Sequence, residues 1–79
     1  MKSEVRSFIL DNFLFTTDQN AISDSESLIE RGIIDSTGVL EVVSFVEEKY
    51  GVEVLDEEMI PENLDSVDSI VAFVTKKQG

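Results

Sequence analysis

The fold can be read from one segment, Gly32-Ile33-Ile34-Asp35-Ser36-Thr37-Gly38-Val39-Leu40-Glu41-Val42-Val43-Ser44-Phe45-Val46-Glu47-Glu48-Lys49-Tyr50-Gly51. On a helical wheel of about 100° per residue, most of its apolar side chains gather on one face and the polar ones lie opposite. A half-buried strand would alternate strictly between apolar and polar residues, and this segment does not. We therefore predict a helix from about Ser36 to Tyr50, with a core face made of Val39, Val42, Val43, Val46 and Tyr50.

Both ends of this segment carry residues that helices prefer there. Asp35 or Ser36 can accept a hydrogen bond from the N–H groups of the first turn. Glu41 lies near the positive end of the helix dipole, where a negative charge is stabilising. Gly51 suits the left-handed conformation that commonly ends a helix.

The residues before this segment predict one helix and one long loop. The helix runs from about Ser3, which can cap it, to Leu14. Its apolar stripe consists of Val5, Phe8, Ile9 and Phe13. From Thr16 to Arg31 the composition turns polar, which indicates a loop with one helical turn near residues 26–30. We expect this loop to be held down by Ile22, Leu28 and Ile29.

The residues after Gly51 predict a short helical turn and a last helix. An apolar connector at Val52–Leu55 leads into a turn at Asp56–Ile60, which Pro61 ends because the residue before a proline avoids helical geometry. Leu64 then enters the core, and Asp65 or Ser66 caps the last helix. Its core stripe consists of Val67, Ile70, Val71 and Val74. The whole chain, residues 1–79, is thus predicted to be one all-α domain, a small four-helix bundle of three longer helices and one short helix.

The composition leaves few groups that could carry out catalysis. The chain has no cysteine and no histidine, so it lacks a thiolate nucleophile, the usual general base and the usual transition-metal ligands. Ser36 alone is a weak nucleophile, and no basic residue is spaced to activate it. We therefore expect neither an enzyme nor a metal site.

The charge of the chain is strongly negative and unevenly placed. The net charge is −11, and residues 35–68 contain eleven of the acidic residues but only one basic residue, Lys49. This balance disfavours nucleic acids and anionic membranes and favours partners with basic surfaces. The longest apolar run, residues 70–74, is far shorter than the roughly 20 residues that span a bilayer. We expect a monomeric cytoplasmic protein without membrane insertion.

The central segment resembles a known family. Leu28 to Ser36, followed by Val39 to Val43 and by Glu47 and Glu48, is similar to the acyl carrier proteins and to the related peptidyl and D-alanyl carriers. The resemblance covers essentially the whole chain in length, order of elements and charge. Its most specific part is the Gly-x-x-Asp-Ser motif at the start of an acidic helix.

The resemblance implies a covalent cofactor. Ser36 would receive 4′-phosphopantetheine from coenzyme A through a separate phosphopantetheinyl transferase that uses Mg²⁺, with Asp35 helping to present the site or the metal. The thiol of the arm would then hold acyl or aminoacyl intermediates as thioesters. The physical chemistry agrees, because a helix N-terminus stabilises an adjacent phosphodiester anion.

The resemblance also implies partner enzymes: a loading ligase and downstream synthases or transferases with basic docking surfaces. On the wheel, Leu40 lies off the valine face on the side of Ser36, as a docking contact would. We predict a partner-binding role for Thr37, Leu40, Glu41, Ser44, Glu47 and Glu48. The alternative is an unmodified acidic adaptor that binds a basic protein surface.

The motif departs from the fatty-acid carriers at one position. Those carriers usually have leucine after the modified serine, whereas this chain has Thr37 followed by Gly38. The order Ile-Ile-Asp-Ser-x-Gly is more similar to the D-alanyl carriers and to free-standing carriers of specialised pathways. The cargo therefore stays open between acyl and aminoacyl groups.

Overall fold

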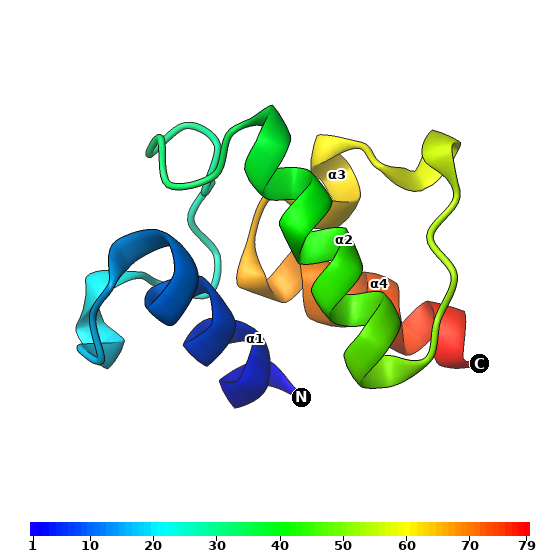
Figure 1. Cartoon of the computed structure of the whole chain (residues 1–79), viewed down its shortest axis with the longest axis horizontal. Coiled ribbons are helices and arrows are strands. Elements are labelled where there is room, and N and C mark those ends of the chain that lie inside the picture. Colours follow the sequence, from blue (N-terminus) through cyan, green and yellow to red (C-terminus); the bar gives the residue numbers. More distant parts are fainter.

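The computed structural model describes all residues 1–79, and every regular element in it is helical. The elements are α1 (Lys2–Ile9), a π-helical turn η1 (Leu10–Leu14), a 3₁₀ turn η2 (Gln19–Ala21), α2 (Ser36–Tyr50), a 3₁₀ turn η3 (Asp56–Glu58), α3 (Pro61–Leu64) and α4 (Val67–Gln78) (Figure 1). The predicted all-α fold, a small bundle with three longer helices and one short one, is confirmed. No helix has both the length and the apolar character needed to cross a bilayer.

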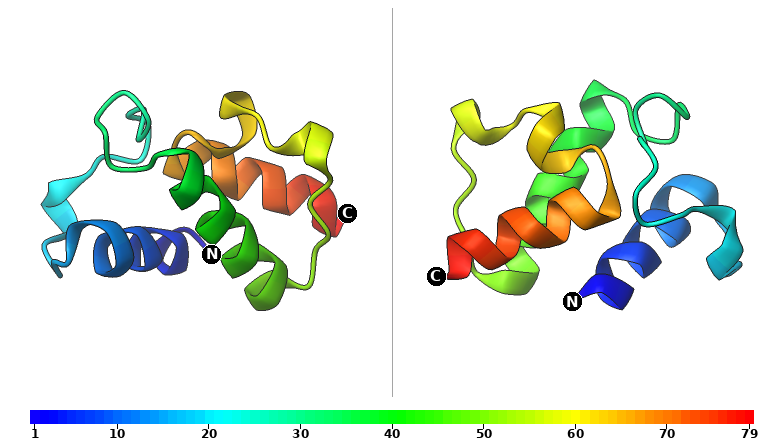
Figure 2. Two further views of the ribbon diagram at one scale, coloured as in Figure 1. Left: turned by 45° about the horizontal axis from the view of Figure 1, so that its top comes forward. Right: turned by 180° about the vertical axis from the view of Figure 1, so that it is seen from behind.

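The helices pack around α4. This helix contacts α1, α2 and α3, and the view from behind shows it lying across α2 with its first turns beside α1 (Figure 2). Fifteen buried apolar side chains form one continuous core. The valine face of α2 enters this core as predicted, since Val42, Val43 and Val46 are buried. Val39 and Tyr50 are half-buried at its edges.

The first helix is confirmed, but its start differs from the prediction. It begins at Lys2 and has no side-chain cap, so the expected capping by Ser3 is wrong. Ser3 lies exposed within the first turn instead. The helix continues from α1 into the π turn η1 and stops at Phe15, which adopts a left-handed conformation with φ 53°. Phe15 is 84% exposed, and no core contact explains this conformation.

The loop between η1 and α2 is packed down, as expected, by Ile22 and Leu28. Ile29 is 41% exposed, so its expected burial is wrong. Leu28 and Ile29 are consecutive in a tight turn, and Leu28 turns inward while its amide donates to the carbonyl of Asp65 at 2.7 Å. Ile29 therefore faces outward.

A half-buried arginine, Arg6, holds the same loop against α1. The guanidinium of Arg6 donates to the Asp24 carboxylate at 2.6 Å, to the carbonyl of Ile22 at 3.1 Å and to the carbonyl of Gln19. The Arg6 side chain is only 13% exposed. Hydrogen bonds from Arg6 and from Lys2 to Asp24 hold the pKa of that carboxyl below its usual value. The sequence pattern gave no sign of this contact.

The region after α2 contains two short elements where one was predicted. Gly51 ends α2 in the left-handed conformation, as expected. The predicted turn forms as η3, and Pro61 then begins a separate helix, α3, at its first position. A proline ends the preceding turn but favours the first position of a helix, because no intrahelical N–H is needed there. Leu64 is buried as predicted, and Ser66 rather than Asp65 caps α4 by accepting from the amide of Ser69 at 3.1 Å.

Candidate functional site

The start of α2 is held by Asp35. Its Oδ1 accepts a hydrogen bond from the amide of Gly38 at 2.7 Å, and its carbonyl accepts from the amide of Val39 at 3.0 Å. Of the two capping residues that the sequence allowed, Asp35 is therefore the N-cap. Ser36 is the first helical residue.

Ser36 makes no use of its hydroxyl within the protein. Its side chain is exposed, and Oγ has no hydrogen-bond partner. The backbone N–H groups of Ser36 and Thr37 also lack acceptors in the protein. A free hydroxyl and two free N–H donors thus meet at the positive end of a helix of 15 residues.

Gly38 makes room for an aromatic ring behind this turn. A Cβ atom at position 38 would lie 2.9 Å from Cε1 of Phe13 and 3.2 Å from Cγ2 of Ile34. These distances are too short for ordinary packing, so only glycine lets Phe13 and Ile34 lie against the first turn of α2. In the sequence, Gly38 is noticeable only within the order Ile-Ile-Asp-Ser-x-Gly, which does not indicate this packing.

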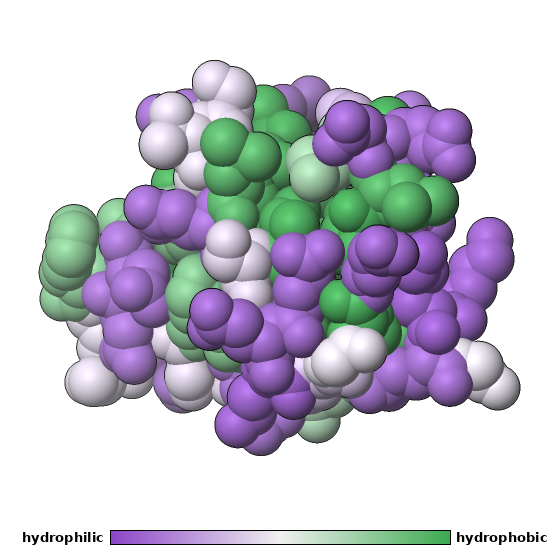
Figure 3. Space-filling view, turned by 45° about the vertical axis from the view of Figure 1, so that its right-hand side comes forward, coloured by the Kyte–Doolittle hydropathy of each residue, from purple (hydrophilic) through white to green (hydrophobic).

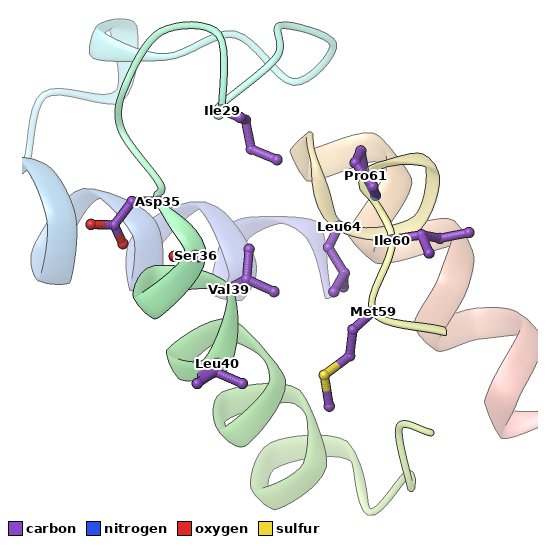
Figure 4. A pocket seen from close by; sticks show the side chains of 9 residues that line it. All are labelled: Ile29, Asp35, Ser36, Val39, Leu40, Met59, Ile60, Pro61 and Leu64. Carbon is purple, nitrogen blue, oxygen red and sulfur yellow. The ribbon is translucent and has the colours of Figure 1, made fainter. Parts of the chain in front are cut away.

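An apolar hollow of about 410 Å³ lies beside Ser36. Its lining residues are Ile29, Asp35, Ser36, Val39, Leu40, Met59, Ile60, Pro61 and Leu64. Figure 4 shows Val39 and Leu40 on one side of the hollow and Met59 and Leu64 on the other. The Ile60 side chain and the Asp35 carboxylate point away from it. Three of its apolar residues are unusually accessible: Ile29, Leu40 and Ile60 are 41%, 56% and 42% exposed.

The apolar character of this part of the surface is visible from outside. Figure 3 shows apolar side chains gathered between stretches of hydrophilic surface. The sequence did not predict the hollow, because its walls come from three segments: the loop before α2, α2 itself and the region around α3. The helical wheel of α2 indicated only that Leu40 lies off the core face.

Most of the predicted partner-binding residues lie together on the α1 side of α2. Thr37, Glu41, Ser44 and Glu48 are exposed, and with Leu40 they line a second, more open hollow of about 440 Å³. Phe8 and Phe45 form part of its lining, with their rings stacked at 4.2 Å between centroids. Neither Glu41 nor Glu48 forms an ion pair, so both charges remain available.

Glu47 does not belong to this group. Its Oε2 accepts a hydrogen bond from the amide of Val54 at 2.9 Å, and the side chain is half-buried. The connector after α2 folds back along the helix and uses this carboxylate as an acceptor. Glu47 is predicted as a partner contact together with these residues, but its carboxylate already accepts a hydrogen bond within the protein. A helical wheel could not indicate this bond, because it does not show which other segment covers a face.

No cluster of three or more acidic side chains is placed to hold a metal ion. The site thus consists of one free hydroxyl, two free N–H groups, an apolar hollow and the unpaired carboxylates of Glu41 and Glu48.

No protein-family model and no curated protein matches the chain.

Proposed function

We propose that this protein is an acyl or aminoacyl carrier whose 4′-phosphopantetheine arm is attached to Ser36. The observation that carries the proposal is the free, exposed hydroxyl of Ser36 at the first position of α2. The resemblance of the central segment to the acyl carrier proteins points to the same serine.

The residues around Ser36 suit a phosphodiester at this position. The N–H groups of Ser36 and Thr37 and the dipole of α2 favour an adjacent anion. Asp35 holds the helix start through Oδ1, so the first turn stays formed while Ser36 reacts. The other oxygen of Asp35 makes no hydrogen bond within the protein and is free to approach a metal ion carried by the transferase.

The proposed attachment step is the transfer of a phosphopantetheinyl group to the hydroxyl of Ser36. The Oγ of Ser36 forms a bond to the phosphorus next to the pantetheine of coenzyme A, and the pyrophosphate bond breaks. Adenosine 3′,5′-bisphosphate leaves, and the proton of the hydroxyl passes to a base on the transferase, since this chain has no histidine. When bound, the arm supplies a thiol that forms thioesters.

The hollow beside Ser36 bears on the cargo. Six of its nine lining residues are hydrophobic, and its only charged residue, Asp35, turns its carboxylate away (Figure 4). Burying a charged group against such walls is unfavourable. An uncharged acyl chain therefore suits the hollow better than an aminoacyl group, whose ammonium would have to stay in solvent.

The partners follow from the exposed stripe on α2. A phosphopantetheinyl transferase, a loading ligase and downstream synthases or transferases would dock through basic surfaces on Glu41 and Glu48, with Leu40 as an apolar contact. Such contacts between charged surfaces weaken as salt screens them. These reactions would take place in the cytoplasm.

The deciding experiment is modification in vitro. The purified protein is incubated with coenzyme A, Mg²⁺ and a broad-specificity phosphopantetheinyl transferase, and its intact mass is measured. We expect a mass increase of one phosphopantetheine group in the wild type and in Ser7→Ala, which removes an exposed hydroxyl of α1 outside the site, and none in Ser36→Ala. No adduct, or an adduct that persists in Ser36→Ala, would refute the proposal.

The second candidate, an unmodified acidic adaptor, is favoured by the unpaired charges of Glu41 and Glu48. It differs from the first candidate in its prediction for Ser36→Ala. Ser36→Ala would retain full binding to a basic partner, whereas Glu41→Lys together with Glu48→Lys would abolish it.

A further inference from the structure

Asp65, between α3 and α4, binds three consecutive residues of the loop that leads to Ser36. Its Oδ2 accepts from the hydroxyl of Ser27 at 2.6 Å, and its Oδ1 accepts from the amide of Ile29 at 2.9 Å. Its carbonyl accepts from the amide of Leu28 at 2.7 Å. Asp65 forms no ion pair and does not cap α4 through its side chain. The bonds to Ser27 and Ile29 are therefore the only ones that its carboxylate makes within the protein.

The residues between Ile29 and Ser36 are themselves held in place, so the segment that Asp65 binds is rigidly connected to Ser36. The carbonyl of Leu28 accepts from the amides of Ile33 at 2.9 Å and Ile34 at 3.3 Å. The Ile34 side chain is 2% exposed, so the residue just before Asp35 is fixed in the core. A displacement at Ser27–Ile29 is therefore passed on to the start of α2.

Asp65 also joins two walls of the hollow beside Ser36. Ile29 forms one wall, and Pro61 and Leu64 form another. The amide of Asp65 donates to the carbonyl of Pro61 at 3.0 Å, while its carboxylate holds the amide of Ile29 at 2.9 Å. The width of the hollow on this side is thus set at Asp65.

We propose that Asp65 is a positioning residue for the modification of Ser36. It contacts none of the reacting atoms, and it acts by holding the Ser27–Ile34 turn and the Ile29 wall in the arrangement that a transferase recognises. This inference rests on the proposed function, since it concerns how Ser36 is presented. If the loop adopts the arrangement that the transferase recognises only part of the time, the apparent affinity of the transferase for this protein falls in proportion to that fraction of time.

The experiment measures transferase kinetics and amide hydrogen exchange on the full-length protein. In Asp65→Ala we expect the KM for this protein as substrate to rise about tenfold with kcat nearly unchanged. The amides of Ile29, Ile33 and Ile34 should exchange faster in the same variant. Ser27→Ala removes one of the two carboxylate bonds, together with the bond that Ser27 Oγ accepts from the amide of Glu30 at 3.1 Å, and should raise the KM in the same way. This variant also tests the inference if Asp65→Ala does not fold.

Two variants separate geometry from charge. Asp68→Ala removes an equal charge from the first turn of α4, where the exposed carboxylate contacts only Lys2 at 3.5 Å, and should leave the KM unchanged. Asp65→Asn retains an acceptor for Ile29 and a group that can bond Ser27, and should restore most of the wild-type KM. An unchanged KM in Asp65→Ala, an equal rise in Asp68→Ala, or no rescue by Asp65→Asn would overturn the inference. A modified wild type with any of these results leaves the proposed function standing, whereas an unmodified wild type overturns both.

Discussion

At the start of α2, two adjacent polar residues have separate roles. Asp35 holds the helix by accepting from the amide of Gly38 at 2.7 Å, while the hydroxyl of Ser36 has no partner in the protein. Because the cap is supplied by the neighbour, Ser36 can carry a covalent group without loosening the helix. This separation of roles supports the attachment that we propose for Ser36.

The two roles predict different costs for removing each side chain. Asp35→Ala should lower the free energy of unfolding by about 1 kcal/mol, because an N-cap bond is lost. Ser36→Ala should change it by less than about 0.5 kcal/mol, since no bond is lost. Urea unfolding followed by circular dichroism measures both.

Asp35→Asn is the matched control for the cap, because asparagine caps helices about as well as aspartate. It should therefore stay close to the wild type. A cost for Ser36→Ala as large as that for Asp35→Ala would show that the hydroxyl is committed to local bonding, contrary to the site described above.

The sequence pointed to Asp35 and Ser36 but did not show which of the two caps α2. Both aspartate and serine are good caps, so the pattern left the choice open until the bond to Gly38 was seen. Glu47 shows the same limit, because its partner is an amide of the connector seven residues further on. Which charges stay free depends on segments that return to the helix, and periodicity does not contain that information.

Among the helices, the end of α2 is tied to the start of α1 through Tyr50. Its hydroxyl donates to Oε1 of Glu4 at 2.8 Å, and Lys49 pairs with Oε2 of the same carboxylate at 3.2 Å. Burial, and then the bond to Glu4, raises the pKa of Tyr50 to about 12. Hydrogen bonds from Tyr50 and Lys49 lower the pKa of Glu4.

This contact predicts how the protein responds to alkaline pH. The pKa of Tyr50 is raised in the folded state, so its contribution to stability is complete below the unfolded value near 10 and is lost as the pH rises through about 12. Tyr50 is the only tyrosine and there is no tryptophan, so tyrosinate absorbance reports this group alone. The titration should show ionisation near pH 12 in the folded protein.

Glu4→Gln tests the cause of that shift. It removes the negative charge that opposes ionisation but leaves the burial, so the apparent pKa of Tyr50 should fall part of the way toward 10. Lys2→Gln, an exposed change on the same helix away from this contact, should not move it. A wild-type midpoint near 10 would mean that Tyr50 is not held against α1.

The elements differ in how well the sequence predicted them. The bounds of α2 agree with the prediction, because its cap, its stripe and its final glycine all lie within one continuous segment. The loop from residue 16 to 31 was predicted only in outline, because Arg6 and Asp65 hold it from 13 to 38 residues away. The apolar hollow needs three such segments to meet, and no local pattern indicates it.

Over the whole molecule, the acidic residues greatly exceed the partners available to them. Ion pairs engage five of the seventeen acidic residues, namely Glu4, Asp24, Glu26, Glu58 and Asp68. Twelve remain without a basic partner, while every basic residue except Lys76 is already paired. Lys49, the only base within residues 35–68, pairs with Glu4 outside that segment. The negative field around α2 is therefore not neutralised internally.

This field predicts that salt stabilises the fold. Unpaired like charges destabilise the compact state, and at 0.1 M salt the Debye length of about 10 Å already screens most pairs of exposed carboxylates. The melting temperature should rise by several degrees as NaCl or MgCl₂ is added, since about 1 kcal/mol shifts the melting temperature of a domain of this size by roughly 4–8 °C.

The double variant Glu53→Gln, Glu57→Gln removes two exposed, unbonded charges and should melt higher than the wild type at low salt. This advantage should shrink as salt is added, because screening removes the same repulsion. The prediction fails if the melting temperature does not change with salt, or if the advantage of the double variant does not depend on salt. Either result would mean that the free carboxylates are too far apart to repel one another.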